Sequence, residues 1–141
     1  MGLDMWLKCG NRKMIKTYLE DLTQEEQWEC NDPFREIGYW RKANAIREWF
    51  VQTCGYPEDG NCEYTEISKR DIEQLKDICK YVLEHRDEAP VLLPTSAGFF
   101  FGEYEYDDQY FESLEETIKI CDNALQTVNW DTEVVIYTDW W

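Results

Sequence analysis

The amino-acid sequence predicts an α+β fold, in which a small antiparallel sheet that includes the N- and C-terminal strands is covered by about three helices. Three observations support this prediction. Apolar residues alternate at the start of the chain, β-branched residues cluster near its end, and three segments between them repeat apolar residues at helical spacing. Because 141 residues is the usual length of one domain, we expect residues 1–141 to form a single domain.

The N-terminal part predicts one strand and one short helix. Apolar side chains occupy every second position from Leu3 to Cys9, which is the spacing of a strand with one buried face. The polar segment that follows is ambiguous, and we expect a short helix around residues 17–30. We expect Pro33 to end the element that precedes it, because the residue before a proline is disfavoured in a helix.

Three longer segments have the apolar spacing of helices. The first runs from Tyr39 to Val51. The second begins near Ser68, which precedes Asp71 by three residues as in a capping box, and continues to about His85. The third spans residues 107–126, and its apolar residues fall on one side.

Two further segments complete the predicted fold. Residues 87–106 contain two prolines and two glycines, so we expect a loop or short-strand region with Phe99, Phe100 and Phe101 at its apolar centre. Residues 134–138 are rich in β-branched side chains, and they predict the C-terminal strand.

Charge is the strongest indication of function. The chain has 30 acidic and 14 basic residues, a formal net charge of −16, and most of the excess lies after Glu84. Such a charge repels nucleic acid and anionic lipid, which argues against direct binding to either. Aromatic residues make up 16% of the chain, a content that favours a folded domain over a disordered acidic tail. No signal peptide or membrane-spanning run is evident, so we expect a cytoplasmic location.

The cysteines and the single histidine predict no metal site and no cofactor. The six cysteines form no C-x-x-C pair, His85 has no cysteine pair at zinc-ligand spacing, and the acidic segments lack the calcium-loop pattern. Cys54 and Cys62 flank a short acidic loop, so they either pair or remain free thiols.

An acidic and aromatic segment is the first candidate site. Its carboxylates would attract a basic protein surface, and its tyrosines would anchor the contact. A solvated helix face is the simpler alternative. The candidate partner-binding residues are Glu103, Tyr104, Glu105, Tyr106, Asp107, Asp108, Glu112, Glu115 and Glu116.

A small basic cluster is the second candidate site. Arg41, Asn44 and Arg47 would share one face of the first long helix, and a guanidinium beside an amide can orient a carboxylate or phosphate. Thr95 and Ser96 would add hydroxyl groups from a loop, although no phosphate-binding motif is present. The alternative is that these cations pair with carboxylates of the protein itself. We assign no catalytic residue, because Ser96 has no histidine in a recognisable nucleophile motif.

Several of these segments resemble an uncharacterised family of small bacteriophage and prophage proteins. The matching segments are the Met-Gly-Leu-Asp-Met start at residues 1–5, the Tyr-Trp-Arg-Lys-Ala-Asn motif at residues 39–44, and the Leu-Pro-Thr…Gly-Phe-Phe-Phe-Gly loop at residues 93–102. The chain has Ala97 where the family tends to have Ser, and Arg47 where it tends to have His. The resemblance implies a phage origin and a host-cytoplasmic setting, and it implies no particular activity.

We therefore expect a phage-encoded, non-enzymatic module that binds a host protein with a basic surface. By mimicking nucleic acid, it would occupy the basic groove of a nucleic-acid-binding or defence protein and inhibit it. The alternative is a small-molecule or nucleotide-binding domain, with or without enzymatic activity, whose pocket lies near the basic cluster.

Overall fold

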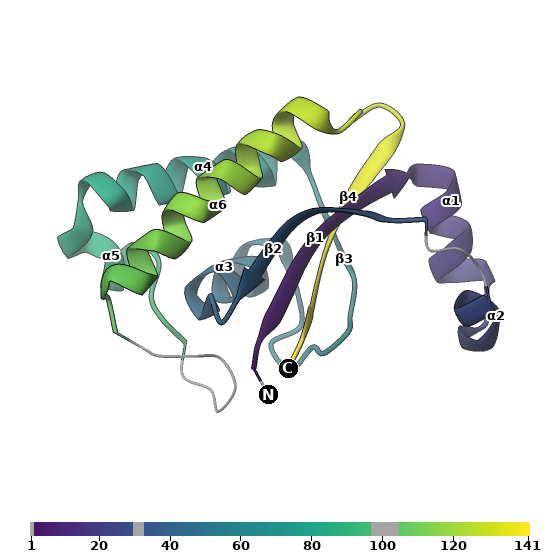
Figure 1. Cartoon of the computed structure of the whole chain (residues 1–141), viewed down its shortest axis with the longest axis horizontal. Coiled ribbons are helices and arrows are strands. Elements are labelled where there is room, and N and C mark those ends of the chain that lie inside the picture. The colour runs from purple at the N-terminus through teal and green to yellow at the C-terminus, as the bar shows by residue number, and fades with distance from the viewer. Residues whose placement is uncertain (1, 30–32, 97–104) are drawn as a thin grey trace.

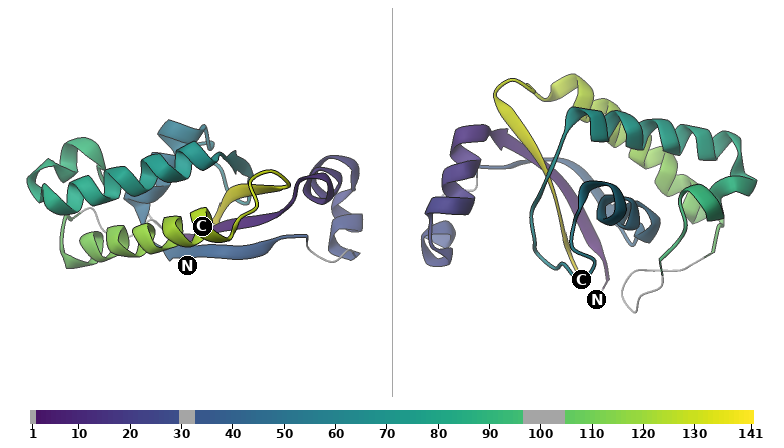
Figure 2. Two further views of the ribbon diagram at one scale, coloured as in Figure 1. Left: turned by 90° about the horizontal axis from the view of Figure 1, so that it is seen from above. Right: turned by 180° about the vertical axis from the view of Figure 1, so that it is seen from behind.

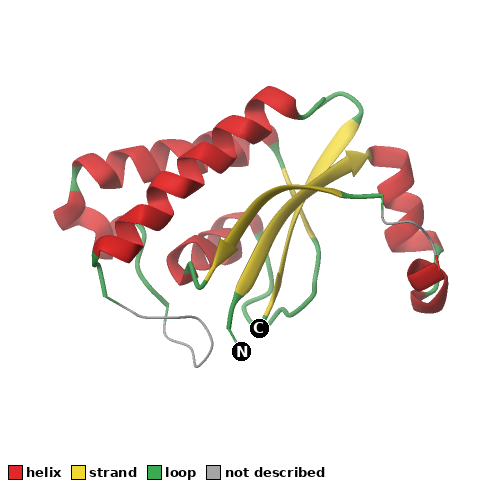
Figure 3. Cartoon of the chain, in the orientation of Figure 1, coloured by secondary structure: helices red, strands yellow, loops and turns green. Residues whose placement is uncertain are grey.

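The fold is α+β and is built on a four-stranded antiparallel sheet (Figures 1 and 3). The structure is a computed structural model, and it describes residues 2–29, 33–96 and 105–141. The strand order in the sheet is β2-β1-β4-β3. The N- and C-terminal strands pair with each other along their whole length at the centre of the sheet, as the sequence predicts. The strands are β1 (Asp4–Asn11), β2 (Arg35–Arg41), β3 (Thr65–Ile67) and β4 (Glu133–Trp140).

The helices fall into two groups. Helices α3, α4 and α6 lie together beside the sheet, and the short α1 and α2 lie apart from them, beyond the end of β1 (Figures 1 and 2). The helical elements are α1 (Arg12–Lys16), the π-helical turn η1 (Thr17–Asp21), α2 (Gln24–Glu29), α3 (Asn44–Cys54), α4 (Lys69–Glu84), the 3-10 turn η2 (Arg86–Glu88), α5 (Ala89–Leu92) and α6 (Asp108–Thr127). No helix in these described parts of the chain is long and apolar enough to cross a membrane.

The core forms between the sheet and helices α3, α4 and α6. Alternate residues of β1, such as Met5 and Leu7, are fully buried, and they face buried side chains of the helices such as Leu75 and Leu114. Burying each such side chain stabilises the fold by about 1.5–3 kcal/mol. Helix α4 begins with the predicted capping box, in which Ser68 and Asp71 exchange side-chain and backbone hydrogen bonds.

The prediction of a helix from Tyr39 is wrong for its first residues. Residues 35–41 form β2, and α3 begins only at Asn44. Trp40 faces the core while Tyr39 and Arg41 are exposed, which is the alternation of a strand. The aromatic residues of this segment fit either period, so the helical spacing was ambiguous. Lys42, with a φ of 57°, ends the strand and redirects the chain.

Two other segments differ from the predictions. The ambiguous N-terminal helix is three short elements, α1, η1 and α2. The expected loop after α4 begins with two helical turns, η2 and α5, and its aromatic centre at residues 99–101 lies outside the described residues. Cys54 and Cys62 do not pair and are both free thiols, which is one of the two alternatives that the sequence left open.

Candidate functional site

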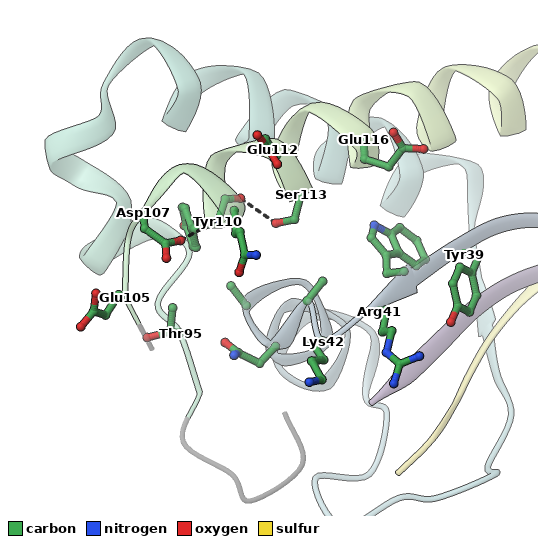
Figure 4. Close-up of a pocket in the computed structure, with 15 residues that line it drawn as sticks. Tyr39, Arg41, Lys42, Thr95, Glu105, Asp107, Tyr110, Glu112, Ser113 and Glu116 are labelled. Atoms are coloured by element: carbon green, nitrogen blue, oxygen red, sulfur yellow. Dashed lines mark hydrogen bonds between the residues drawn. The ribbon is translucent and has the colours of Figure 1, made fainter. Parts of the chain in front are cut away.

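A cavity of about 700 Å³ opens between the end of β2 and the start of α6 (Figure 4). Residues 39–45 form one side of it, from the end of β2 into α3. Residues of α6 and of the segment just before it form the other side, and Thr95 also lines the cavity. The volume lies in the range of sites that bind small ligands, about 300–1,000 Å³.

Carboxylates from the first candidate site border this cavity. Glu105, Asp107, Glu112 and Glu116 all line it, along α6 and its lead-in segment (Figure 4). Asp107 also has a structural role, because its Oδ1 accepts a hydrogen bond from the N–H of Tyr110 at 3.1 Å and caps α6.

The remaining residues of the first candidate site lie elsewhere. Asp108 and Glu115 are exposed on α6 and do not line the cavity. Tyr106 is not a free anchor, because it packs against the core and its hydroxyl accepts a hydrogen bond from the N–H of Thr95 at 3.1 Å. Glu103 and Tyr104 lie outside the described residues.

Three residues of the second candidate site, Arg41, Asn44 and Thr95, line the same cavity. Ser96 approaches Asn44, because its backbone N–H donates to Asn44 Oδ1 at 3.0 Å. The two candidate sites are alternatives in the sequence, but some residues of each line the same cavity. Arg47 is the exception, because it does not line the cavity.

Arg47 forms a fully buried ion pair instead. Its Nε donates to Asp139 Oδ2 at 2.7 Å, and both side chains are at most 1% exposed. Asp139 also accepts hydrogen bonds from the hydroxyls of Tyr56 and Tyr137, at 2.6 and 2.8 Å. Arg47 is therefore a structural residue, held by one of the protein's own carboxylates, which is the alternative considered from the sequence.

The same arginine fixes the loop that follows α3. Its second amino group donates to the backbone carbonyls of Glu58 and Gly60, at 2.9 and 3.1 Å. The indole N–H of Trp141 donates to the same Gly60 carbonyl at 2.7 Å. Because its charge and its donors are matched inside the core, Arg47 has no evident role in binding a ligand.

Buried tyrosines around this ion pair make the free energy of unfolding depend on pH in the alkaline range. Burial raises the pKa of Tyr137 and Tyr56 well above 10, and the hydrogen bonds to Asp139 add to this shift. Burial likewise raises the pKa of Tyr110. In the unfolded chain these groups ionise near their ordinary pKa of about 10. Above that pH the folded state keeps protons that the unfolded state loses, so stability falls as pH rises.

We therefore expect the free energy of unfolding to decrease above about pH 10, the ordinary pKa of a tyrosine. Urea unfolding at a series of pH values measures this decrease. The Tyr56→Phe variant is the control, because it removes one ionising group and should flatten the dependence. An unfolding free energy that stays constant through this alkaline range would contradict the assignment.

The charged groups around the cavity form no ion pair within 4.0 Å among the described residues. Ion pairs between described residues join Arg12 to Glu66, Arg35 to Glu133, Arg47 to Asp139 and Lys76 to Asp122. None of them includes Arg41, Lys42 or a carboxylate of the cavity. Within the same residues, no group of three or more histidine, cysteine or acidic side chains is placed to hold a metal ion.

Sequence reasoning missed several residues of the cavity. Lys42 was treated as part of a helix, although it follows β2 and lines the cavity beside Arg41. Ser113 and Gln109 also line it, and nothing in the sequence marked them. The adjacent pair Arg41-Lys42 was the available signal, because such a pair stands out among so many acids.

Comparisons with known proteins find no match for this chain. No family model matches the chain, and no curated protein or solved structure matches it.

Proposed function

We propose that the chain is an acidic module that binds a basic protein through what we call the α6 acidic surface. This surface consists of the exposed residues Glu105, Asp108, Glu112, Glu115 and Glu116. One observation carries the proposal: all five are exposed, none forms an ion pair with a described residue, and no basic residue occurs between positions 105 and 118.

The density of charge on this surface supports mimicry of a nucleic-acid strand. With a rise of about 1.5 Å per residue, positions 108 to 116 of α6 span about 12 Å. Four carboxylates occupy that length, whereas one DNA strand carries a phosphate about every 3.4 Å. The α6 acidic surface therefore supplies charge at nearly the density of one strand. A groove lined with lysine and arginine would attract it over a distance and speed association.

The resemblance to phage and prophage proteins favours a target inside a bacterial host. A nucleic-acid-binding protein, including one that defends the cell, has the cation-lined groove that the α6 acidic surface would occupy. Binding there would inhibit the target by excluding its nucleic acid, without any chemical reaction in this chain.

The test reverses charge on α6 and compares it with the same change elsewhere. In the first variant Glu112, Glu115 and Glu116 become lysine. In the control, three exposed acids of α4 become lysine, which gives the same net charge; these are Glu73, Asp77 and Glu84. Each protein is immobilised and exposed to bacterial lysate freed of nucleic acid.

We expect the unmodified chain and the α4 control to retain a basic protein, and the α6 variant to lose it. The retained protein should be released as salt rises towards 1 M, where the screening length falls to about 3 Å. It should also be displaced by duplex DNA. Equal retention by the two variants would contradict the proposal.

A second function is favoured by the composition of the cavity. All six residues of the Tyr-Trp-Arg-Lys-Ala-Asn motif at positions 39–44 line it, and so does Thr95 from the second motif. We propose on this basis that the cavity is a ligand site in its own right. A bound ligand would stabilise the fold by about 2.7 kcal/mol at 100 times its Kd, which a thermal-shift panel detects.

A further inference from the structure

The sheet has a second face, which is turned away from α3. On the first face, Leu7 lies opposite Tyr137, and the ring of Tyr137 stacks on that of Phe50 of α3 with 4.1 Å between centroids. Successive side chains of a strand point to opposite faces, so the alternate residues of β1 project from the second face. These residues are Asp4, Trp6 and Lys8. Helix α3 lies behind the strands in Figure 1, which therefore looks onto this second face.

Within the described residues, the second face is covered at one end and open at the other. A Cβ added to Gly10 would lie 2.3 Å from the carbonyl oxygen of Pro33 and 3.1 Å from Cδ1 of Ile15, so these two residues cover that end. At the other end, where β1 begins and β2 and β4 finish, aromatic side chains remain accessible. Tyr39 is 41% exposed there and Trp140 is 59% exposed. Exposed apolar patches of this kind mark interaction sites.

Aromatic rings form the centre of this open end. Trp6 and Tyr39 are cross-strand partners on β1 and β2, and their ring centroids lie 5.8 Å apart. Trp140 of β4 lies opposite Asp4 and extends the aromatic area along the edge of the patch. Tryptophan and tyrosine are the residues that most often carry binding energy at the centre of a protein interface.

Four charges surround these rings, and their signs alternate. Asp4 and Lys8 of β1 lie on either side of the central indole. Arg41 is the β2 partner of Asp4, and its Nη2 lies 3.6 Å from where a Cβ on Gly2 would be, on this face. Glu36 is the β2 partner of Lys8. Each acid thus has a base beside it on the neighbouring strand and another about 13 Å away along its own strand. None of the four forms an ion pair within 4.0 Å among the described residues.

We propose that this open end of the sheet is the interface through which two copies of the chain form a symmetric dimer. A two-fold axis parallel to the face would bring the same patch of both copies together. If the axis runs along the strands, Asp4 of one copy meets Arg41 of the other. If it runs across the strands, Asp4 meets Lys8. Because the signs alternate, opposite charges meet at all four positions in either case, and the aromatic rings meet at the centre.

A second copy matches this charge pattern better than another partner does. A partner of uniform charge would meet a like charge at two of the four positions, which costs affinity. The net charge of −16 makes two copies repel each other over most of their surfaces, whereas these four charges sum to zero. The inference goes beyond both proposed functions, because neither involves association of the chain with itself.

Sedimentation velocity of the full chain tests this interface. At an ionic strength of about 0.15 M the screening length is about 8 Å, which limits the long-range repulsion between two acidic chains. We expect a dimer that dissociates on dilution. Arg41→Glu brings like charges together under either axis, so it should weaken dimerisation at least about 10-fold. Arg70→Glu makes the same charge change at an exposed position of α4 and should leave the dimer unchanged.

Mixing two variants tests whether the charges face one another. Asp4→Lys and Glu36→Lys should each weaken self-association, as Arg41→Glu does. A mixture of Arg41→Glu with Asp4→Lys should restore a dimer if the two-fold axis runs along the strands. A mixture of Arg41→Glu with Glu36→Lys should restore it if the axis runs across them. Either restoration supports the interface and identifies the axis.

Four results would overturn the inference. A chain that stays monomeric at its highest soluble concentration has no such interface. A dimer that Arg41→Glu leaves intact forms through another surface. Equal weakening by Arg41→Glu and Arg70→Glu would trace the effect to net charge. Failure of both mixtures to restore a dimer, with every variant matching the unmodified chain in circular dichroism, would show that the four charges do not meet.

Discussion

Replacing Asp139 with alanine is expected to lower the free energy of unfolding by about 3–5 kcal/mol, the usual cost of breaking a buried ion pair. The change leaves the Arg47 guanidinium, which is 1% exposed, without a counter-charge. It also removes the acceptor for the hydroxyls of Tyr56 and Tyr137. Chemical denaturation monitored by circular dichroism measures the loss.

Two further variants separate the ion pair from a general effect of mutation. Asp59→Ala changes an exposed aspartate of the neighbouring loop and should alter stability by less than about 0.5 kcal/mol. Arg47→Met combined with Asp139→Leu removes both charges and should be less damaging than Asp139→Ala alone. If Asp139→Ala were no more destabilising than Asp59→Ala, the buried ion pair would not contribute to the free energy of unfolding as its geometry indicates.

Substitution of Gly38 with alanine is expected to destabilise the protein by about 1–3 kcal/mol, because it overpacks the contact between β2 and α6. A Cβ at this position would lie 2.3 Å from Cγ2 of Ile120, and that side chain is only 6% exposed. Helix α6 would have to move away from the sheet. The same shift would disturb the cavity, because α6 forms one of its sides.

A double-mutant cycle with Ile120→Ala checks this contact. Truncation of Ile120 alone creates a hole and should cost about 2–5 kcal/mol. In the double variant the added methyl group fills part of that hole, so its cost should be smaller than the sum of the two single changes. Strictly additive effects would mean that the two residues do not compete for space.

Much of the fold follows from local patterns in the sequence. The alternation from Leu3 to Cys9 predicted β1, and the capping box at Ser68 predicted the start of α4. Both patterns are strong because one face of each element is buried. The β-branched run that predicted β4 is less regular, because residues 134–139 of this central strand are buried on both faces.

The elements that were missed depend on contacts distant in sequence. β3 has only three residues, and it is a strand because it pairs with β4. β2 carries an irregularity opposite Leu7 and Lys8, which breaks its alternation and hides its period.

The candidate site was predicted only in part, because it too depends on contacts distant in sequence. Arg41 and Asn44 were assigned to a ligand pocket, and both line the cavity. Some acids of α6 line it too, although they were assigned to partner binding, because the proximity of the two groups is a tertiary property. The role of Arg47 was also out of reach of local sequence patterns. Its partner Asp139 is 92 residues away, so no local pattern could separate a buried structural arginine from a ligand-binding one.

The pairing of β1 with β4 determines how the molecule responds to mechanical force. Asp4 pairs with Trp140 at one end of this ladder, so the two ends of the described chain lie side by side (Figures 1 and 2). Tension applied to both ends loads the last pair first, and hydrogen bonds perpendicular to the strands then open one after another. Tension applied through Asp4 and Glu133 would instead shear the whole ladder at once. The protein should therefore peel open easily from its ends, although its centre is the most deeply buried part of the sheet.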